Sequence, residues 1–289
     1  MVSQYTRDDR SVNQSASGWQ GRLDLRLTRL QGKTVPAYSR TAAPLRLQRP
    51  FYAVSAPEDC QSVIVHTAGG MVGGDTLTVA VEAEPHTQAL ITTAAAHKIY
   101  RCPQSWTRQS TRLTIAPHSC LSWLPQETIL FDGGRLQQTL TVELAPEATW
   151  SGWDLVRLGR SARQESFRHG CWRTITEVWR QGTPLWIDRQ QVQGESAVLD
   201  HYHGLGGWPV VGTFLMIGRQ PAAEQIRALR DLPTPEVGEV GITAVSHGLV
   251  GRYRGPSSQE ARRYFVNIWQ YLRREVLGQT NYLPRVWGV

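Results

Sequence analysis

Hydrophobic and polar residues alternate along most of the chain. In residues 23–27, LDLRL, every second residue is leucine. Side chains of a β-strand point alternately to its two faces, so this period predicts a strand with one buried face. Similar runs, bounded by Pro, Gly, Asn or Asp, occur at residues 62–66, 77–83, 88–93, 111–116, 121–124, 139–144 and 174–179. The pattern predicts a mainly β protein.

Three of these strands begin segments that resemble one another. The segments start at residues 77, 113 and 140, and each has an alternating strand, a turn at a proline and a second apolar strand. The prolines, Pro85, Pro117 and Pro146, recur at intervals of about 30 residues, within the range of stacked repeats. The segments fit either ordinary hairpins in a β-sandwich or stacked β-layers in a helix-like solenoid.

Helical periodicity is confined to the last third of the chain. A short helix is predicted from Pro221 to Arg230, with the proline in the first turn, where its missing N–H is tolerated. A longer helix is predicted to begin at Ser257, which would form a capping box with Glu260. Gly278 would end it. We therefore expect two helices beside the strands.

The longer helix is amphipathic. Its apolar residues recur at three- and four-residue steps, at Ala261, Tyr264, Phe265, Ile268, Trp269, Leu272 and Val276. Its polar residues are expected mainly on the other face, at Arg262, Arg263, Gln270 and Arg273. Such an apolar stripe is more typical of packing on a sheet than of docking to a partner protein.

The predicted elements form one domain. Residues 1–18 are polar, so we expect a flexible tail followed by a single β-rich domain over residues 19–289. The tail lacks the apolar region of a secretion signal, and no apolar run is long enough to span a membrane, so we expect a cytoplasmic protein. The four cysteines lie far apart and do not indicate a disulfide framework.

The chain carries a formal net charge of +7, supplied mostly by scattered arginines. A basic protein can bind nucleic acid, an acidic membrane or an acidic protein. The sequence has no basic run of five to eight residues, zinc-finger spacing or RNA-binding signature. The distribution favours an acidic protein partner, with a basic RNA-binding protein as an alternative.

The sequence carries no local catalytic signature. Gly32-Lys33-Thr34 resembles the end of a phosphate-binding loop, but Leu27 stands where that loop requires its first glycine. Residues 159–163 lack the second glycine of a nucleophile elbow. We therefore do not expect an enzyme.

Two carboxylates lie in unusual settings. Two glycine pairs in residues 69–74 precede Asp75 and allow close approach of backbone segments, so Asp75 is expected to hydrogen-bond a turn, or else to be exposed as a ligand. Glu127 lies within an otherwise apolar segment. A carboxylate between strands must be paired, bound to a cation or facing water.

Four segments resemble successive motifs of the urease accessory protein UreD family, also called UreH. They are GGMVGGD at 69–75, AAAHKIYR at 94–101, LSWLPQETILFDG at 121–133 and LGRSARQESFRHG at 158–170. The resemblance extends to GKT at 32–34, PLRLQRPFY at 44–52, RYRG at 252–255 and LPRVW at 283–287. The chain departs from the family at His97, usually a small hydroxyl residue, at Asp154, usually glutamate, and within 161–165.

The resemblance implies a urease maturation factor with no activity of its own. By this resemblance, the chain would act as a scaffold that joins apo-urease to the accessory protein UreF. Through UreF it would also be joined to the GTPase UreG, which releases nickel. The implied fold is a β-rich, helix-like stack with few helices. No tightly bound cofactor is implied, only transient Ni²⁺.

The resemblance also implies functional residues. Polar positions of the family motifs match Asp75, Lys98, Glu127, Asp132 and Glu165, whose carboxylates would line a nickel path, with Asp75 and Glu127 as candidate metal contacts. Other motif positions match Gly69, Gly70, Gly73, Gly74, Tyr100, Trp123, Pro125 and Gln126. Sparse carboxylates attract a cation without trapping it, which suits a conduit.

Two further hypotheses remain open. His201 and His203 would present two imidazoles on one side of an extended segment, either as metal contacts or in an exposed loop. A β-helical carbohydrate-active enzyme is the alternative function from another class, because such enzymes expose paired carboxylates along a groove. Glu127 and Asp132 could share one strand segment, but no second acidic wall is indicated.

Overall fold

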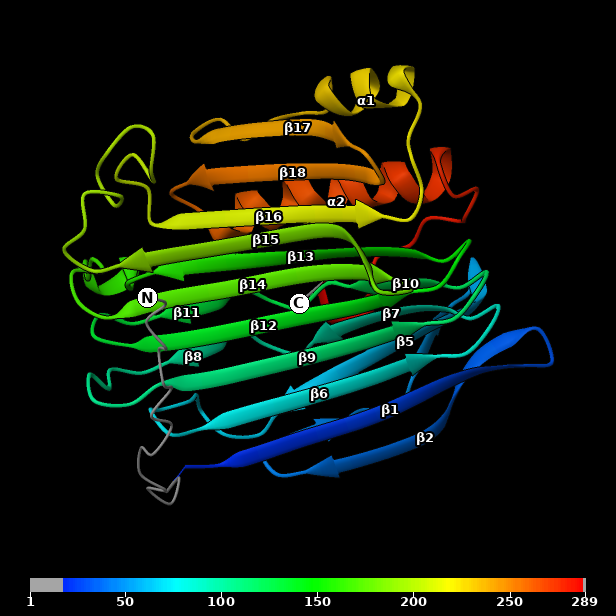
Figure 1. The fold of residues 1–289 in the computed structure, drawn as a ribbon, viewed down its shortest axis with the longest axis horizontal. Helices are drawn as coiled ribbons and strands as arrows, with labels where there is room; N and C mark the ends of the chain where they lie inside the picture. Colours follow the sequence, from blue (N-terminus) through cyan, green and yellow to red (C-terminus); the bar gives the residue numbers. More distant parts are fainter. Residues whose placement is uncertain (1–17, 288–289) are drawn as a thin grey trace, which may run out of the picture.

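The structure of the chain is a computed structural model that describes residues 18–287. It is mainly β, as predicted, with two layers of strands and a few helices (Figure 1). The expected tail at residues 1–18 lies, except for its last residue, outside the described residues. No helix among the described residues has the length and apolar character needed to cross a membrane.

Seven strands form the first sheet, called sheet A, in the order β15-β14-β12-β9-β6-β1-β2. Their bounds are β1 Gln20–Leu30, β2 Lys33–Ala42, β6 Thr76–Ala83, β9 Thr107–Ile115, β12 Arg135–Leu144, β14 Cys171–Arg180 and β15 Thr183–Gln193. The five central strands are parallel to one another, whereas β2 and β15 pair antiparallel at the two edges.

The second sheet, sheet B, has the order β17-β18-β16-β13-β10-β7-β5-β3, with three short strands beside this path. Its bounds are β3 Leu45–Leu47, β4 Phe51–Ala53, β5 Ala56–His66, β7 Gln88–Thr93, β8 His97–Ile99, β10 Cys120–Trp123, β11 Thr128–Leu130, β13 Thr149–Leu158, β16 Val210–Ile217, β17 Glu239–Val245 and β18 Gly248–Gly255. Strands β5, β7, β10 and β13 are parallel, and β16, β18 and β17 continue the sheet antiparallel.

The three similar segments are three turns of a β-solenoid. In each, the strand before the proline belongs to sheet A and the strand after it to sheet B, as in β6–β7, β9–β10 and β12–β13. Each strand pairs in parallel with the equivalent strand of the next turn. The hairpin interpretation is therefore wrong, because the strands on either side of a proline do not pair with each other.

The corners that follow the prolines share one backbone conformation. His86, His118 and Glu147 have φ angles of 64°, 59° and 61°, the positive values of the third residue of a type II turn, which takes proline at its second position. The corners stack in register. The rings of His86 and His118 lie parallel with centroids 5.0 Å apart, and His118 Nδ1 lies 2.8 Å from Glu147 Oε2.

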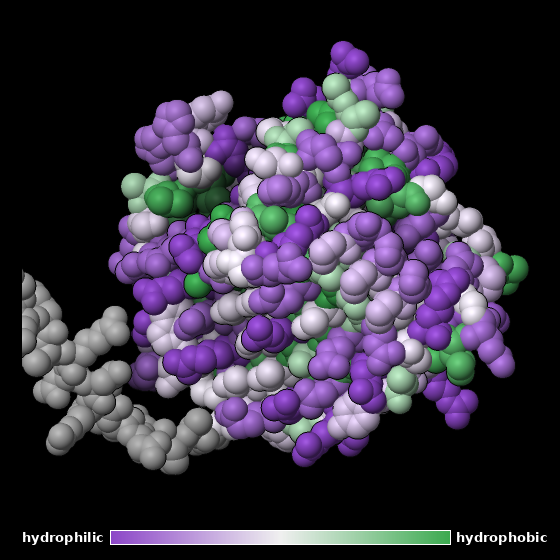
Figure 2. Space-filling view, turned by 45° about the vertical axis from the view of Figure 1, so that its right-hand side comes forward, coloured by the Kyte–Doolittle hydropathy of each residue, from purple (hydrophilic) through white to green (hydrophobic). Residues whose placement is uncertain are grey.

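The alternating positions bury their apolar side chains between the two sheets. Leu23, Leu25 and Leu27 of β1 are at most 2% exposed, as their period predicts. The large exposed hydrophobic residues, by contrast, come from separate parts of the chain. The face in view in Figure 2 is accordingly mainly hydrophilic, with hydrophobic residues in small, separated groups.

Two α-helices, α1 Ala223–Arg230 and α2 Ser258–Glu275, lie in the C-terminal third, and two short 3₁₀ turns cover Ser161–Arg163 and Arg285–Trp287. Helix α2 packs along sheet B on β13, β16 and β18 (Figure 1). Most of its predicted apolar stripe is buried there, so the packing interpretation is confirmed.

Three details of the helix predictions are wrong. Pro221 precedes the N-cap, Ala222, instead of lying in the first turn. Ser257 accepts the N–H of Glu260 as predicted, but the Glu260 carboxylate contacts Arg263 at 2.9 Å instead of closing a capping box. Arg273 does not lie on the exposed face of the helix, since only 3% of its surface is exposed.

Arg273 is buried because it neutralises a buried acid on β5. Its Nη1 lies 2.9 Å from Oδ2 of Asp59, and that same oxygen accepts the Tyr282 hydroxyl at 2.8 Å. The guanidinium also donates to the Thr280 carbonyl. This ion pair joins α2 and the C-terminal segment to sheet B.

We expect Arg273→Met to lower the free energy of unfolding by about 3–5 kcal/mol, because it leaves the Asp59 charge buried without its partner. Urea denaturation at pH 7 measures the change. The matched control is Arg274→Met at the next position, whose side chain is 65% exposed and which should change stability by about 0.5 kcal/mol or less. Equal effects of the two substitutions would contradict the assignment.

Candidate functional site

Two of the four family-like motifs contain interruptions in sheet B. Residues 94–96 separate β7 from β8, and residues 124–127 separate β10 from β11. Strand β8 pairs with β11, and β11 with β13, so the two interruptions lie in neighbouring turns of the solenoid. The other two motifs form loops that contact β8 and β11 at the same end of the sheet.

Pro125 explains the second interruption. It has no N–H to donate to a ladder, and the N–H of Gln126 is taken by the Thr93 hydroxyl at 2.9 Å. The Pro125 carbonyl accepts the indole N–H of Trp153 at 2.6 Å. As a result, β13 pairs with β10 up to Gly152 and with β11 only from Val156, leaving residues 153–155 unpaired on this side.

A cavity of about 80 Å³ lies between the sheets at this level. At about 30 Å³ for each water molecule in the liquid, it has room for about two or three. Its walls mix apolar side chains with polar ones, the latter being Thr93, His97, Gln109, Thr111, Gln126, Thr128, Gln138, Thr139, Asp154, Thr174 and Thr176. Three residues that the motifs indicated, Trp123, Pro125 and Gln126, therefore line this cavity.

A chain of hydrogen bonds runs along one wall of the cavity. The Trp172 indole N–H donates to Gln138 Oε1 at 2.8 Å, Gln138 Nε2 to Gln109 Oε1 at 3.3 Å, and Gln109 Nε2 to His97 Nδ1 at 3.1 Å. An indole can only donate, so Trp172 sets the direction of every bond in the chain. His97 Nδ1 must therefore accept, and the ring proton lies on Nε2.

His97 is uncharged at neutral pH. Burial, and secondarily the neighbouring His66, lower the pKa of its imidazole to about 4. The rings of His66 and His97 lie with centroids 5.6 Å apart. His97 thus adds a neutral hydrogen-bond donor to the cavity wall.

Asp154 lies on β13 in the middle of the unpaired stretch. Part of its surface faces the cavity. Burial raises the pKa of its carboxyl to about 6, the nearby Asp188 carboxylate adds to the increase, and a hydrogen bond with Thr174 opposes it. Among the described residues, no basic side chain forms an ion pair with Asp154.

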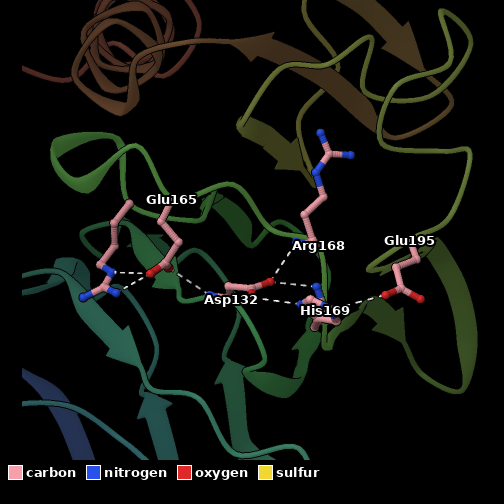
Figure 3. A network of polar contacts seen from close by, with 6 residues as sticks. Asp132, Glu165, Arg168, His169 and Glu195 are labelled. Carbon is pink, nitrogen blue, oxygen red and sulfur yellow. Dashed lines mark hydrogen bonds and ion pairs between the residues drawn. The ribbon is translucent and has the colours of Figure 1, made fainter.

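Asp132 and Glu165 come from two different motifs and lie close together at the end of sheet B (Figure 3). Glu165 Oε1 accepts the backbone N–H of Asp132 at 2.9 Å, and its other oxygen accepts from Arg160. Asp132 Oδ1 accepts the backbone N–H groups of Arg168 and His169, each at 2.7 Å. The two acids therefore hold the loop after β13 against the turn after β11.

His169 extends this network to the loop after β15. Its Nδ1 lies 3.0 Å from Asp132 Oδ2 and its Nε2 lies 3.2 Å from Glu195 Oε1 (Figure 3). Arg160 stacks over the Phe131 ring at 4.3 Å, and Tyr100 meets the same ring edge-on. Aromatic packing and hydrogen bonds together fix this end of the solenoid.

The hydrogen bonds in the network favour the charged forms of both acids. Partial burial acts to raise the pKa of Asp132, but the donors from His169 and Arg168 outweigh it, and the pKa is lowered. The pKa of Glu165 is lowered chiefly by Arg160. Both groups are therefore fully ionised at neutral pH.

The other predicted polar residues lie apart from this network. Asp75 is buried, and its two oxygens accept the backbone N–H groups of Trp19 and Val72, each at 2.8 Å. This arrangement agrees with the turn interpretation of Asp75. Lys98 is exposed on β8. Asp75, Lys98 and the Asp132–Glu165 pair do not converge on one point.

Glu127 lies on the outer side of the interruption that contains Pro125. Its Oε1 lies 3.2 Å from the Ser258 hydroxyl and its Oε2 lies 3.8 Å from Nη1 of Arg262, both at the start of α2. The same guanidinium donates to the side chain of Gln126. The apolar segment thus carries a paired carboxylate, one of the three settings expected for it.

The motif glycines allow close backbone approach. A Cβ at Gly70 would lie 2.4 Å from the Tyr100 ring, and one at Gly73 would lie 2.4 Å from Cys102 Sγ. The Tyr100 hydroxyl donates to the Gly69 carbonyl at 3.0 Å. Gly74 adopts a φ of 97°, which side chains rarely allow. These residues pack the loop before β6 against β8.

His201 and His203 lie in an exposed loop of consecutive turns, so the extended conformation considered for them is not present. His201 Nδ1 accepts the backbone N–H of His203 at 3.2 Å. Within residues 18–287, no group of three or more His, Cys, Asp or Glu side chains is arranged to hold a metal ion.

Several residues of the site were not predicted. The cavity acid Asp154 and the glutamines Gln109 and Gln138 were missed as site residues. Asp154 had a signal in the sequence, because it is a lone carboxylate in the apolar segment TWSGWDLV, as Glu127 is in its own segment. The glutamines had none, since they occupy ordinary alternating positions of β9 and β12.

We expect Asp132→Asn to lower the free energy of unfolding at pH 7 by about 1–3 kcal/mol, because backbone donors lose a charged acceptor. The pKa of Asp132 is lower in the folded chain than in the unfolded one. Its contribution is therefore complete above about pH 4 and is lost as the pH falls through the folded value. Urea denaturation between pH 7 and pH 3 should show the two proteins converging.

Glu195→Gln is the control for this prediction, because it removes the exposed second partner of His169 and should change stability by about 0.5 kcal/mol or less. A constant difference between wild type and Asp132→Asn across this pH range would show that the carboxylate charge does not hold the loops.

Comparisons with known proteins agree with the resemblance of these motifs to the UreD family. The sequence model of a family described as UreD urease accessory protein matches residues 20–288. A urease accessory protein UreD of Nostoc punctiforme is 49% identical over 277 residues, covering 96% of this chain and 99% of the relative.

More distant relatives match over similar lengths. Urease accessory proteins UreD of Thermosynechococcus vestitus and Nitrosococcus oceani are 45% and 38% identical, covering 94% and 93% of this chain and 99% and 90% of the relatives. Identity at this level over nearly full length, with the family match, shows that the chain belongs to the UreD family of urease accessory proteins.

Proposed function

We propose that the chain is a scaffold for urease maturation that binds apo-urease and the accessory protein UreF, contacts the GTPase UreG through UreF, and assists nickel delivery to the urease active site. Membership of the UreD family supports a role in urease maturation. The observation that carries the nickel part of the proposal is the cavity between the sheets, with the polar side chains in its walls.

The cavity walls suit a passing cation better than a bound one. Amide and hydroxyl groups of glutamine and threonine side chains offer neutral oxygen atoms, and Asp154 supplies one carboxylate. Tight binding of a transition metal needs several ligands fixed in its preferred geometry. An ion and its water shell would therefore be stabilised inside the protein without being held.

The start of α2 covers the interruption beside the cavity. Gln126 lines the cavity, and its side chain is held by Arg262, which also faces Glu127. Glu127 thus lies between the cavity wall and the outer surface. We propose that this contact is where an ion or a partner meets the interior, and that Glu127 keeps its predicted role as a polar residue of the nickel path.

The geometry gives less support to the two alternatives. The carbohydrate-active alternative rests on Glu127 and Asp132, but Glu127 is paired with Ser258 and Arg262, and both oxygens of Asp132 accept hydrogen bonds. Several arginines are paired with acids, among them Arg160, Arg252 and Arg254. The chain as a whole carries a net charge of +7, which suits an acidic protein partner.

Reconstitution tests the proposal directly. Urease subunits, UreF and UreG would be co-expressed in nickel-containing medium with and without this chain. We expect urease to copurify with the chain, and to contain nickel and hydrolyse urea only when the chain is present. Equal nickel content and activity in its absence would overturn the proposal.

We expect Glu127→Gln to reduce the urease activity reached in this assay by more than its effect on folding predicts, because it removes the charge beside the interruption and keeps the side-chain shape. Thermal unfolding provides the reference for folding. The matched control is Glu260→Gln on the first turn of α2, whose carboxylate contacts only Arg263 among the described residues. Equal activation by both variants would remove Glu127 from the nickel path.

A further inference from the structure

The outer face of sheet A is the face that is turned away from sheet B. Both α-helices pack on sheet B, and Figure 1 shows sheet A nearest the viewer. The strand register aligns the outward side chains of sheet A in rows that cross the sheet. Each row is therefore a line of side chains about 4.8 Å apart, one from each strand.

Charge is unevenly distributed over these rows. The first row, at the starts of the parallel strands, consists of Gln20, Thr76, Arg108, Gln137, Arg173 and Gln191. The outward acids of the same strands all lie in the third and fourth rows, at Asp24, Glu82, Glu143 and Glu177. The strand starts are therefore positive, and no acid of the sheet lies beside them.

The arginines of the later rows are paired with these acids. Arg189 in the second row, for example, lies 3.0 Å from Glu177 in the third. Arg108 and Arg173 of the first row form no ion pair within the part of the chain that the structure describes, and neither does Arg135, two residues before the row on β12. Three neighbouring cations are thus left without a counter-charge.

Trp106, directly before β9, holds two of these cations in place. Cζ of Arg135 lies 4.5 Å from the centroid of its ring, and Cζ of Arg173 lies 4.9 Å from it. Arg135 also donates to the Pro103 carbonyl at 3.1 Å, and Arg173 donates to the side chain of Gln191 at 3.0 Å. All these contacts are with neutral groups, and a guanidinium has five N–H donors. Both cations therefore keep their charge and free donors for an anion.

We propose that the first row, together with Arg135 and Trp106, docks an acidic segment of a partner protein. Carboxylates bind guanidinium groups through two parallel N–H···O bonds. Because Trp106 already orders two of the arginines, binding costs less side-chain entropy. The glutamine and threonine side chains of the row can hydrogen-bond the backbone of the bound segment.

The same face is less suited to a nucleic acid. A phosphate backbone is charged at every nucleotide, so the acids of the third and fourth rows would repel a strand that crosses the sheet. Proteins that bind single strands also offer open aromatic rings for stacking, whereas two guanidiniums occupy Trp106. A protein segment can place carboxylates against the arginines and basic residues against the acids.

The inference deepens the proposed function and rests on it, because a scaffold that joins several proteins needs separate docking surfaces. Helix α2 covers the outer face of sheet B, where Arg262 contacts Gln126 and Glu127. The first row lies on the outer face of the other sheet. A partner docked there would leave the contact at the start of α2 accessible to a second partner.

Binding of a fluorescein-labelled octaglutamate peptide to the full chain, measured by fluorescence anisotropy in about 50 mM salt, tests the inference. We expect Arg108→Gln combined with Arg173→Gln to weaken binding about tenfold or more, because each glutamine loses a charge-assisted contact. Both side chains are exposed, so the fold should be kept, and thermal unfolding checks this.

Arg46→Gln combined with Arg49→Gln is the matched control. It removes two exposed arginines outside sheet A that form no ion pair among the described residues, and it should weaken binding less than about twofold. If the two double variants lost the same affinity, the peptide would be responding to net charge alone, and the inference would be overturned.

A labelled octauridylate RNA is the second ligand. We expect it to bind more weakly than the peptide and to be affected similarly by the two double variants. RNA that bound more tightly than the peptide, and that lost this affinity only with Arg108 and Arg173 replaced, would overturn the assignment to a protein partner.

The urease reconstitution assay separates this inference from the proposed function. A wild-type chain that activates urease, but whose peptide affinity does not depend on the first row, would overturn only the inference. A chain that binds the peptide at the first row and does not support urease activation would overturn only the proposed function.

Discussion

The arrangement of this protein depends on one constraint, the parallel pairing of equivalent strands in successive turns of the solenoid. Each turn adds one strand to each sheet, so a residue on one wall is followed by its equivalents in the turns above and below. Pro125 breaks this rule because it cannot donate to the ladder. The break frees residues 153–155 of β13 from pairing on one side and places polar side chains around a cavity.

The buried and half-buried acids of this chain differ in what compensates their charge. Asp59 is neutralised by Arg273, and Asp75 is bound by backbone N–H groups, so both stabilise the fold. Asp132 and Glu165 fasten two loops to the end of sheet B in a similar way. Asp154 differs from all of them, because its charge faces open space. In a family of urease accessory proteins, that difference separates an acid with a proposed functional role from acids that hold the structure.

Much of the fold could be predicted from local patterns. Alternation identified most of the central strands, and the apolar stripe identified α2, because both signals arise within a few residues. The choice between hairpins and a solenoid could not be made, since it depends on pairing between strands about 30 residues apart. Arg273 was placed on the wrong face because a helical period cannot anticipate an acid on β5 that needs a cation. For the site, the resemblance led to the segments that form it, whereas the meeting of Asp132 and Glu165, and the cavity itself, arise only when the turns stack.

The central claim is that an unpaired carboxylate lies in a hydrated space between the two sheets. This claim underlies the proposed nickel path, and it concerns the metal-free protein. The most direct measurement is a crystal structure of the metal-free chain at a resolution that shows ordered water. Our account predicts water molecules in the cavity that bridge the Asp154 carboxylate to the glutamine and threonine side chains of its walls. A dry, closed interior, or a basic side chain bound to Asp154, would contradict it.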